Sequence, residues 1–395
     1  MLSRRGAQSR STRDLKIDFL RGLAMACVII DHSKRSSLLS WFSYQRFWVV
    51  TAAEVFVVLS GVVLGMVYGP RLARDGLRFV VHRLGRRALT LYFAFVGVTL
   101  SVLALALSGI DVSAVASWEE SAMSWFLDPR SMTAENWRDL FLLRHGPWAF
   151  EIVGLYVWLV LAAVPCLIAL QRLGWRWLLA SSWAVYLIYR LVPFQLTASE
   201  FELVFPILAW QLLFVHGITI GYHRDDIATV AARCPKALPI SVGCACAAFM
   251  AFALSNPSVD GPAWLYWRVV SPDRFFTLYD KYFSLSDLGI GRILNLAVAL
   301  PVGYALLAWQ AIWNVAGRLQ ALFVTLGQGS LAAFVLHVYG LLLLAHLPET
   351  ETLWINTVMQ ILLIVGIAAA LKAINRMPAR RRVRPIQPHV QPLAA

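Results

Sequence analysis

The chain has 395 residues, of which 59% are hydrophobic and only 14% are charged, and its formal net charge is +13. Soluble domains carry about 25% charged residues, so this composition excludes an ordinary water-soluble fold. The arginines lie mainly in short loops and in both tails, which favours membrane topology over nucleic-acid binding as the reason for the positive charge.

Ten apolar blocks follow one another, each near the roughly 20 residues that cross a hydrocarbon core as a helix. Without the alternating period of a β-barrel, they predict an all-α polytopic transmembrane helical bundle of about ten transmembrane helices. The blocks lie at approximately 17–32, 47–69, 88–109, 148–170, 176–195, 202–221, 237–255, 290–313, 321–347 and 352–373.

Charge distribution predicts how the bundle sits in the membrane. With the N-terminus in the cytoplasm, the inner segments hold 23 of the 35 Lys and Arg residues and the outer segments hold 9. Cytoplasmic loops carry such an excess, so we expect both termini in the cytoplasm and the long connections 110–147 and 256–289 outside. The expected organisation is a basic tail at 1–16, a transmembrane domain at 17–373 surrounded by membrane lipid, and a second basic tail at 374–395.

The first block contains several ionisable residues, which are costly in a membrane and usually functional or paired. Asp18 and Arg21 are three residues apart and can pair on one helix face. Arg21 and His32 are eleven apart, which places them within about 20° of each other and roughly 16 Å apart along the axis. A polar stripe therefore runs along this helix and ends at Asp31 and His32. The alternative is two interfacial groups, one at each end of the helix.

Two later blocks also carry carboxylates. Glu54 lies well inside the second block, where a lone carboxylate must be protonated or paired. Glu151 opens the fourth block, five residues before Tyr156. We interpret Glu54 as functional or as half of a buried pair, and Glu151 as either functional or interfacial.

A basic cluster, HRLGRR, precedes the third block and contains Arg83, Arg86 and Arg87. Arginine side chains bind phosphates well, so the cluster can form a cytoplasmic anion site for a phosphate-rich donor such as coenzyme A. The alternative is simple anchoring of the helix at the inner face.

Together these segments resemble the OpgC family of integral-membrane acyltransferases. RDLKIDFLRGLAMACVIIDH, residues 13–32, is similar to the family's opening, and Arg21 and His32 match the R-x10-H motif of the wider superfamily. Further resemblances follow in chain order: the E-x-F-V-x-L-S-G element at 54–61, the basic stretch with Tyr92, EIVGLYVWL from Glu151, AWQLLFVHGITIG with Trp210 and Gln211, DKYFSLSDLGIGRIL with Lys281 and Arg292, and LGQGSLAAFVLH ending at His337.

The resemblance implies a membrane O-acyltransferase in the bacterial cytoplasmic (inner) membrane. The donor would be acyl-CoA, in this family succinyl-CoA, and the acceptor a hydroxyl of an extracytoplasmic glycan such as an osmoregulated periplasmic glucan. No metal is implied. His32 would act as general base or acyl carrier, with Asp31 or Glu54 fixing its tautomer. Arg21 would order the helix through Asp18 or contact the donor, and His337 would be a second candidate base or a packed polar residue. The remaining candidates fall into two groups: Arg83, Arg86, Arg87, Asp18 and Tyr92 for the donor, and Glu151, Tyr156, Trp210, Gln211, Lys281, Arg292 and His337 for substrate.

The acceptor side is expected in the outer connection 256–289, which is rich in aromatic residues interleaved with charges. Aromatic faces suit a sugar, although aromatic residues also form interfacial belts. Two other functions compete with acyl transfer: a transporter or flippase, for which inverted repeats are expected, and a structural or sensor protein. The oligomeric state stays open.

Overall fold

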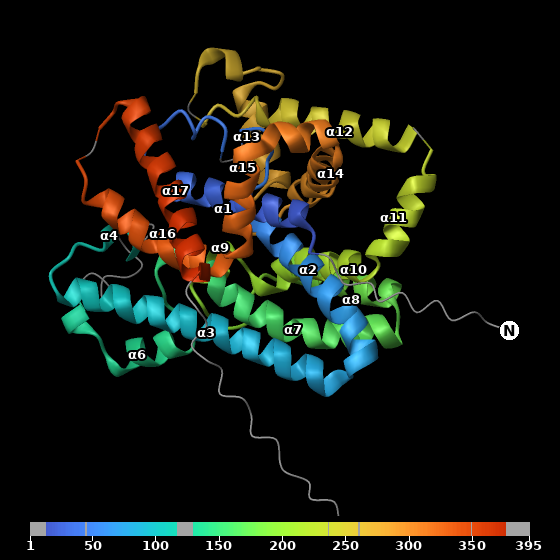
Figure 1. The fold of residues 1–395 in the computed structure, drawn as a ribbon, viewed down its shortest axis with the longest axis horizontal. Coiled ribbons are helices and arrows are strands. Elements are labelled where there is room, and N and C mark those ends of the chain that lie inside the picture. Colours follow the sequence, from blue (N-terminus) through green and yellow to red (C-terminus); the bar gives the residue numbers. More distant parts are fainter. Residues whose placement is uncertain are drawn as a thin grey trace, which may run out of the picture.

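The computed structural model describes residues 13–376 except 44–45, 117–128, 236, 260 and 349. Over this part of the chain all regular elements are helices, with no strand (Figure 1). The expected tails at 1–16 and 374–395 fall largely outside the described residues. The long helices are α1 (Leu15–His32), α2 (Ala52–Asp75), α3 (Leu77–Leu107), α7 (Ile152–Arg172), α8 (Trp175–Leu191), α10 (Ile207–Tyr222), α12 (Ala237–Ala253), α14 (Ile290–Ala308), α15 (Gln310–Gln328), α16 (Ser330–Ala345) and α17 (Leu353–Arg376).

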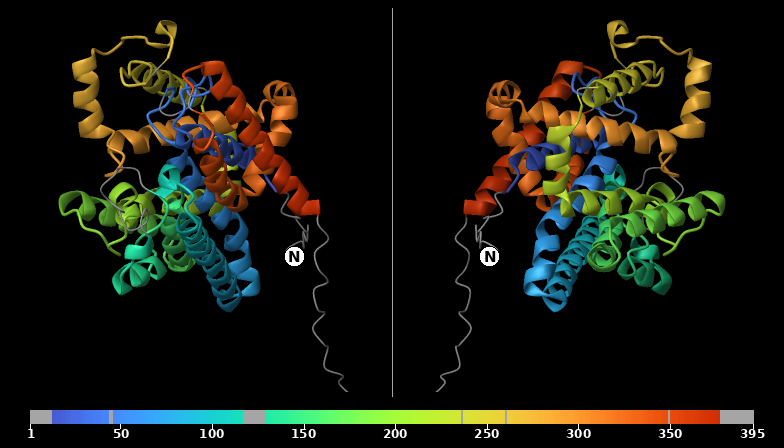
Figure 2. Two further views of the ribbon diagram at one scale, coloured as in Figure 1. Left: turned by 90° about the vertical axis from the view of Figure 1, so that its left-hand side faces the viewer. Right: turned by 90° about the vertical axis from the view of Figure 1, so that its right-hand side faces the viewer.

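Shorter helices lie in the connections between them. The connection 110–147 contains α4 (Ser113–Ala116), η1 (Pro129–Ser131) and α6 (Ala134–Phe141), and η2 (Trp148–Phe150) leads into α7. Three more follow along the chain: α9 (Phe201–Val204) before α10, α11 (Arg224–Arg233) before α12, and η3 (Ala263–Leu265) with α13 (Pro272–Tyr282) in the connection 256–289. Figure 2 shows α13 and its neighbouring loop projecting from the main body of helices.

Several helices suit a membrane, but fewer than the expected ten are both long enough and apolar enough to cross it. Among the described residues, 5 helices are long and apolar enough to cross, or up to 7 if each bent pair counts as one span. The difference has two physical sources. α8, α10, α12 and α16 have only 16 or 17 residues, and α1 carries the charges of the polar stripe.

Three expected blocks are each divided in the structure. Block 321–347 is not one straight span, because Leu319–Gln328 and Ser330–Ala345 meet at 98° around Gly329. Block 202–221 is split into α9 and α10 at Phe205 and Pro206. Proline lacks the backbone N–H that would continue a helix, so Pro206 explains the second break. The third, block 290–313, crosses Trp309, where α14 ends and α15 begins.

Glycines bring α2 and α10 into backbone contact. A Cβ on Gly65 would lie 2.1 Å from the carbonyl oxygen of Ile218, and one on Gly221 would lie 2.0 Å from that of Val62. Gly61 and Gly217 approach the opposite helix in the same way. Small residues spaced four apart allow membrane helices to pack this closely, so α2 and α10 lie in direct contact along this crossing.

α1 lies inside the bundle, packed against α2, α14, α15, α16 and α17 (Figure 1). Its contact with α15 also depends on glycine: a Cβ on Gly22 would lie 1.7 Å from the carbonyl oxygen of Phe323, and one on Gly327 would lie 1.8 Å from that of Asp18. This close crossing places the α15–α16 corner directly over the polar stripe of α1.

Candidate active site

Two histidines meet at the C-terminal end of α1. Nδ1 of His32 lies 3.3 Å from Nε2 of His337 on α16, and the ring centroids are 5.4 Å apart. His337 is completely buried, whereas His32 is partly exposed. Nδ1 of His337 lies 2.6 Å from the backbone carbonyl oxygen of Phe334. Both candidate bases from the sequence therefore belong to one site, 305 residues apart in the chain.

Trp148 packs against the His32 ring. Its ring centroid lies 4.7 Å from that of His32, and its indole Nε1 donates to the carbonyl oxygen of Ala114 at 3.0 Å. The Lys34 ammonium lies 5.0 Å from the centre of the same indole. His32 thus has an aromatic ring and a cation beside it.

The two carboxylates expected to fix the tautomer of His32 have other partners. Oδ1 of Asp31 accepts a hydrogen bond from the Ser43 hydroxyl at 2.5 Å. Glu54 is fully buried and its Oε2 accepts from the backbone N–H of Thr51 at 2.8 Å, closing a capping box at the start of α2. It is His337 that faces Nδ1 of His32.

Glu54 also forms a buried ion pair with Arg292 of α14. Oε1 of Glu54 lies 2.6 Å from Nε and 2.5 Å from Nη2 of Arg292, and both side chains are 0% exposed. Nη1 of Arg292 donates to the carbonyl oxygen of Phe283 at 3.2 Å. Arg292 was expected to contact substrate, but these contacts describe a link between α2 and α14.

At the inner part of the stripe, Asp18 and Arg21 each bond another residue in place of the expected Asp18–Arg21 pair. Asp18 pairs with Arg13, with Nε to Oδ2 at 2.5 Å, and Nη2 of Arg21 donates to the Ser330 hydroxyl at 2.5 Å. The glycine-mediated crossing of α1 and α15 explains the change, because it brings Ser330 over Arg21.

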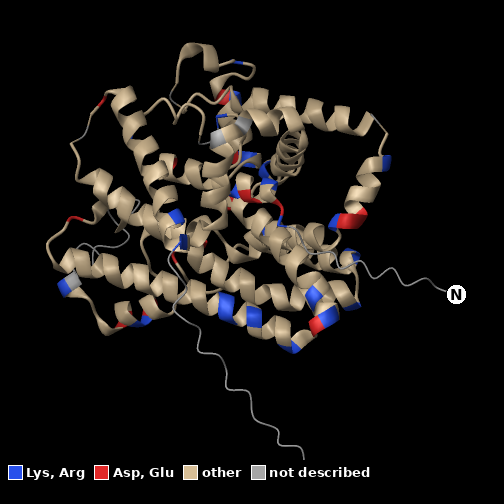
Figure 3. Cartoon of the chain, viewed as in Figure 1, with Lys and Arg blue, Asp and Glu red and all other residues tan. Residues whose placement is uncertain are grey.

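Arg87 is separated from the other two arginines of its cluster. Arg83 and Arg86 are exposed on α3, and the Arg83 guanidinium lies 5.2 Å from the Phe79 ring. Arg87 is partly buried, and both Arg87 and Tyr156 are close enough to Arg21 to act on it electrostatically. Figure 3 shows the concentration of Lys and Arg where α2 ends and α3 begins.

The remaining predicted residues lie outside the histidine pair, the Glu54–Arg292 ion pair and the surroundings of Arg21. The Tyr92 hydroxyl donates to the carbonyl oxygen of Phe141 at 3.1 Å. Trp210 is fully buried, and its ring is edge-on to Phe205. Gln211 accepts a hydrogen bond from Ser182 on α8. Glu151 immediately precedes α7, and Lys281 is exposed near the end of α13. Their predicted roles with donor or substrate stay predictions.

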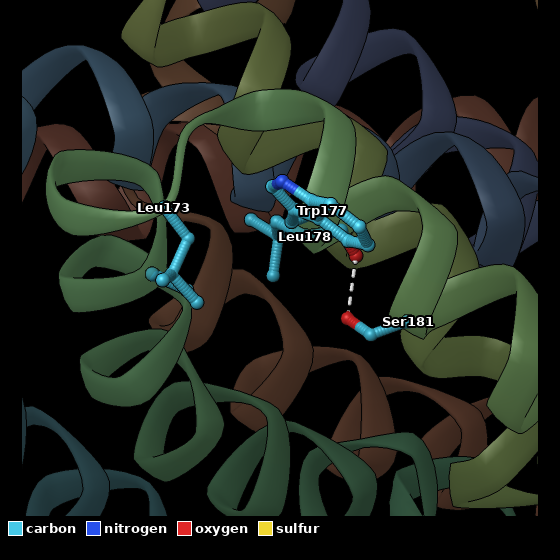
Figure 4. A pocket seen from close by; sticks show the side chains of 5 residues that line it. Leu173, Trp177, Leu178 and Ser181 are labelled. Atoms are coloured by element: carbon cyan, nitrogen blue, oxygen red, sulfur yellow. Dashed lines mark hydrogen bonds between the residues drawn. The ribbon is translucent and has the colours of Figure 1, made fainter.

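An apolar pocket of about 380 Å³ lies between the end of α7 and the start of α8 (Figure 4). Leu173, Trp177 and Leu178 line it, and the Ser181 hydroxyl at its edge donates to the Leu178 carbonyl at 2.8 Å. Since the site histidines and arginines do not line this pocket, it is separate from the candidate active site.

Sequence reasoning missed Trp148, Lys34 and Ser330 as parts of the site. Trp148 opens the fourth block next to Glu151, and Ser330 lies in the LGQGSLAAFVLH segment, so both were within segments already singled out. Neither residue type indicates chemistry alone, and only the fold brings them beside His32 and Arg21.

Comparison with known proteins gives one match. The family described as OpgC protein matches residues 13–380, nearly the whole chain. No curated protein matches, and no solved structure does.

Proposed function

The chain belongs to the OpgC protein family, and from this membership and the paired histidines we propose that it is a membrane O-acyltransferase using acyl-CoA. The family suggests a transferase activity within an acyltransferase-like membrane protein. The proposal adds a donor, succinyl-CoA, and an acceptor, a hydroxyl of an extracytoplasmic glycan such as a periplasmic glucan. The observation that carries it is the contact between His337 and His32. His32 lies on the same helix as Arg21.

We assign the role of general base to His32, which contacts His337 at the end of α1. In the proposed reaction it takes the proton from the acceptor hydroxyl while the oxygen attacks the thioester carbonyl carbon. A carbon–oxygen bond forms, the carbon–sulfur bond breaks, and the proton passes from His32 to the departing coenzyme A sulfur. A histidine can accept and return a proton near neutral pH.

The donor would reach His32 from the inner end of α1. Arg87 and Arg21 supply two cations near Tyr156, and His32 lies about three helical turns, roughly 16 Å, further along the same helix. Phosphates held near Arg87 would let the extended pantetheine arm follow the polar stripe, so that the thioester arrives beside the histidine pair.

Arg87→Ala should weaken acyl-CoA affinity by about 10–100-fold, because hydrogen bonds to charged groups contribute about 1.5–3 kcal/mol each. Arg83→Ala is the matched control: it removes the same charge four residues away, where the side chain is exposed and rests on Phe79. Isothermal titration of purified variants with acyl-CoA checks the difference. Equal losses of acyl-CoA affinity in both variants would show that the arginines attract the donor only through their overall charge and not through a specific site at Arg87.

The orientation of the chain is part of the proposal, because the donor is made in the cytoplasm and the acceptor lies outside. We expect both termini in the cytoplasm of a bacterial inner-membrane protein, as the distribution of Lys and Arg favours. A topology reporter fused after Ala395 should therefore be active only on the cytoplasmic side. Activity only on the outer side would reverse the arrangement and disconnect Arg87 from the donor.

The acceptor side is proposed at the outer connection 256–289. Trp264 and Trp267 are more than half exposed, at 65% and 54%, and Lys281 is exposed on α13. Phe275 of the same connection is instead buried, stacked on Phe252 at 4.7 Å. The buried ring stabilises the connection, while the exposed indoles offer flat faces to a sugar.

Transport or flipping of a glycan or lipid-linked substrate is favoured by one observation, the 98° bend between the helices that meet at Gly329. Transporters often build substrate sites from broken helices. Mass spectrometry of cell-envelope glycans from a deletion strain separates the two functions. Loss of an acyl substituent from an otherwise exported glycan supports acyl transfer, and unchanged substitution would contradict it.

A further inference from the structure

The arrangement of nitrogen atoms at the histidine pair defines which atom of His32 is basic. Nδ1 of His337 lies 2.6 Å from the carbonyl oxygen of Phe334. A carbonyl oxygen only accepts hydrogen bonds, so this Nδ1 carries the hydrogen. A neutral imidazole has one N–H, so Nε2 of His337 is left as an acceptor.

His337 is neutral because its surroundings do not favour a cation. It is 0% exposed, its ring lies edge-on to Phe334 at 5.4 Å, and Phe334 in turn packs on Phe56. The charged groups on the elements packed against α16 include Lys34, which is a cation near His32, and Asp31, which accepts from Ser43. They also include Arg21, which donates to Ser330, and Arg35, which donates to Leu344 and Leu347. Burying an unpaired charge among such side chains is costly.

We propose that His337 is a positioning residue that holds His32 with its hydrogen on Nδ1 and its lone pair on Nε2. Nε2 of His337 faces Nδ1 of His32 at 3.3 Å. Two lone pairs would repel there, so Nδ1 of His32 donates. The inference rests on the proposed function for its consequence: Nε2 of His32 is the atom that removes the acceptor's proton, and His337 takes no proton itself.

A contact elsewhere on these elements ties the segment after His32 to the helix that carries His337. Arg35, three residues after His32, donates through Nη2 to the carbonyl oxygens of Leu344 and Leu347, each at 2.8 Å. Leu344 lies in the last turn of α16, the helix that carries His337, and Leu347 follows the end of that helix. The segment following His32 is therefore tied to the same helix as its partner.

Glutamine and asparagine at position 337 separate this role from simple packing. The side-chain amide of Gln reaches about as far as Nε2 of His and can accept from His32, whereas that of Asn matches Nδ1 and can bond only the Phe334 carbonyl. We expect His337→Gln to retain turnover within a few-fold of the parent and His337→Asn to lose about 10²-fold, part of what a general base contributes. The KM for acyl-CoA should change in neither.

The proposal is overturned if His337→Asn keeps parental turnover, or if His337→Gln loses as much as His337→Asn while both variants remain folded. Nitrogen-15 NMR of the histidine-labelled parent protein tests it without any activity assay, with the His32→Ala spectrum identifying the His32 signals. Protonation at Nδ1 and a bare Nε2 are expected. A hydrogen on Nε2 would contradict the proposal even if acyl transfer is established, and the expected tautomer would stand even if transfer is not found.

Discussion

Replacing His32 with alanine should slow acyl transfer by about 10²–10⁴-fold, the contribution that a general base typically makes. His32 is partly exposed beside Trp148, and its Nδ1 lies 3.3 Å from Nε2 of His337. Donor affinity should survive in this variant, because the proposed phosphate site near Arg87 lies at the opposite end of the polar stripe. Purified His32→Ala protein should therefore bind acyl-CoA but release little free thiol.

The matched control for this experiment is His223→Ala. His223 lies between α10 and α11, and its Nδ1 is 3.1 Å from Oδ2 of Asp226. Its loss should leave transfer unchanged. If His32→Ala transfers acyl groups at the parental rate, the base is another residue, and His337 and Glu54 become the leading candidates.

Breaking the Glu54–Arg292 pair should destabilise the protein by about 3–5 kcal/mol, because removal of one partner leaves a buried charge uncompensated. Either Glu54→Leu or Arg292→Met should show this loss, since both side chains are 0% exposed and joined at 2.5–2.6 Å. The change is measured by thermal unfolding in detergent, with the remaining fraction of monodisperse protein as the readout.

The double variant Glu54→Leu/Arg292→Met distinguishes pairing from packing. Apolar residues of similar volume often replace a buried ion pair with little loss, so the double variant should regain more than half of the stability lost by either single variant. A loss equal to the sum of the two single losses would show that the groups act independently.

The positions of most helices were predictable, because apolar blocks and charge distribution depend on local composition. The block 17–32 corresponds to α1 (Leu15–His32), and 352–373 corresponds to α17 (Leu353–Arg376). The change of direction at Gly329 was not predictable in this way. An apolar stretch predicts that a segment avoids water, but it does not predict where the chain bends. The block 321–347 therefore was expected as one helix where the structure has two.

Individual site residues were easier to find than their partners. His32 and His337 both emerged as candidates, but their contact spans 305 residues. Local spacing predicted an Asp18–Arg21 pair, whereas the fold supplies Arg13 and Ser330 instead. Glu54 and Arg292 are each a charge inside an apolar block, and the need to neutralise both was a signal that they form a pair.

Release of free thiol from acyl-CoA by the purified protein tests the central claim most directly, with and without an oligosaccharide acceptor. A membrane acyltransferase should release coenzyme A thiol when both succinyl-CoA and the oligosaccharide are present, and the release should disappear in His32→Ala. A transporter or flippase has no need to cleave a thioester. Thiol levels that stay equal to those of protein-free controls when both succinyl-CoA and the oligosaccharide are present, with oligosaccharide transport intact, would contradict acyl transfer.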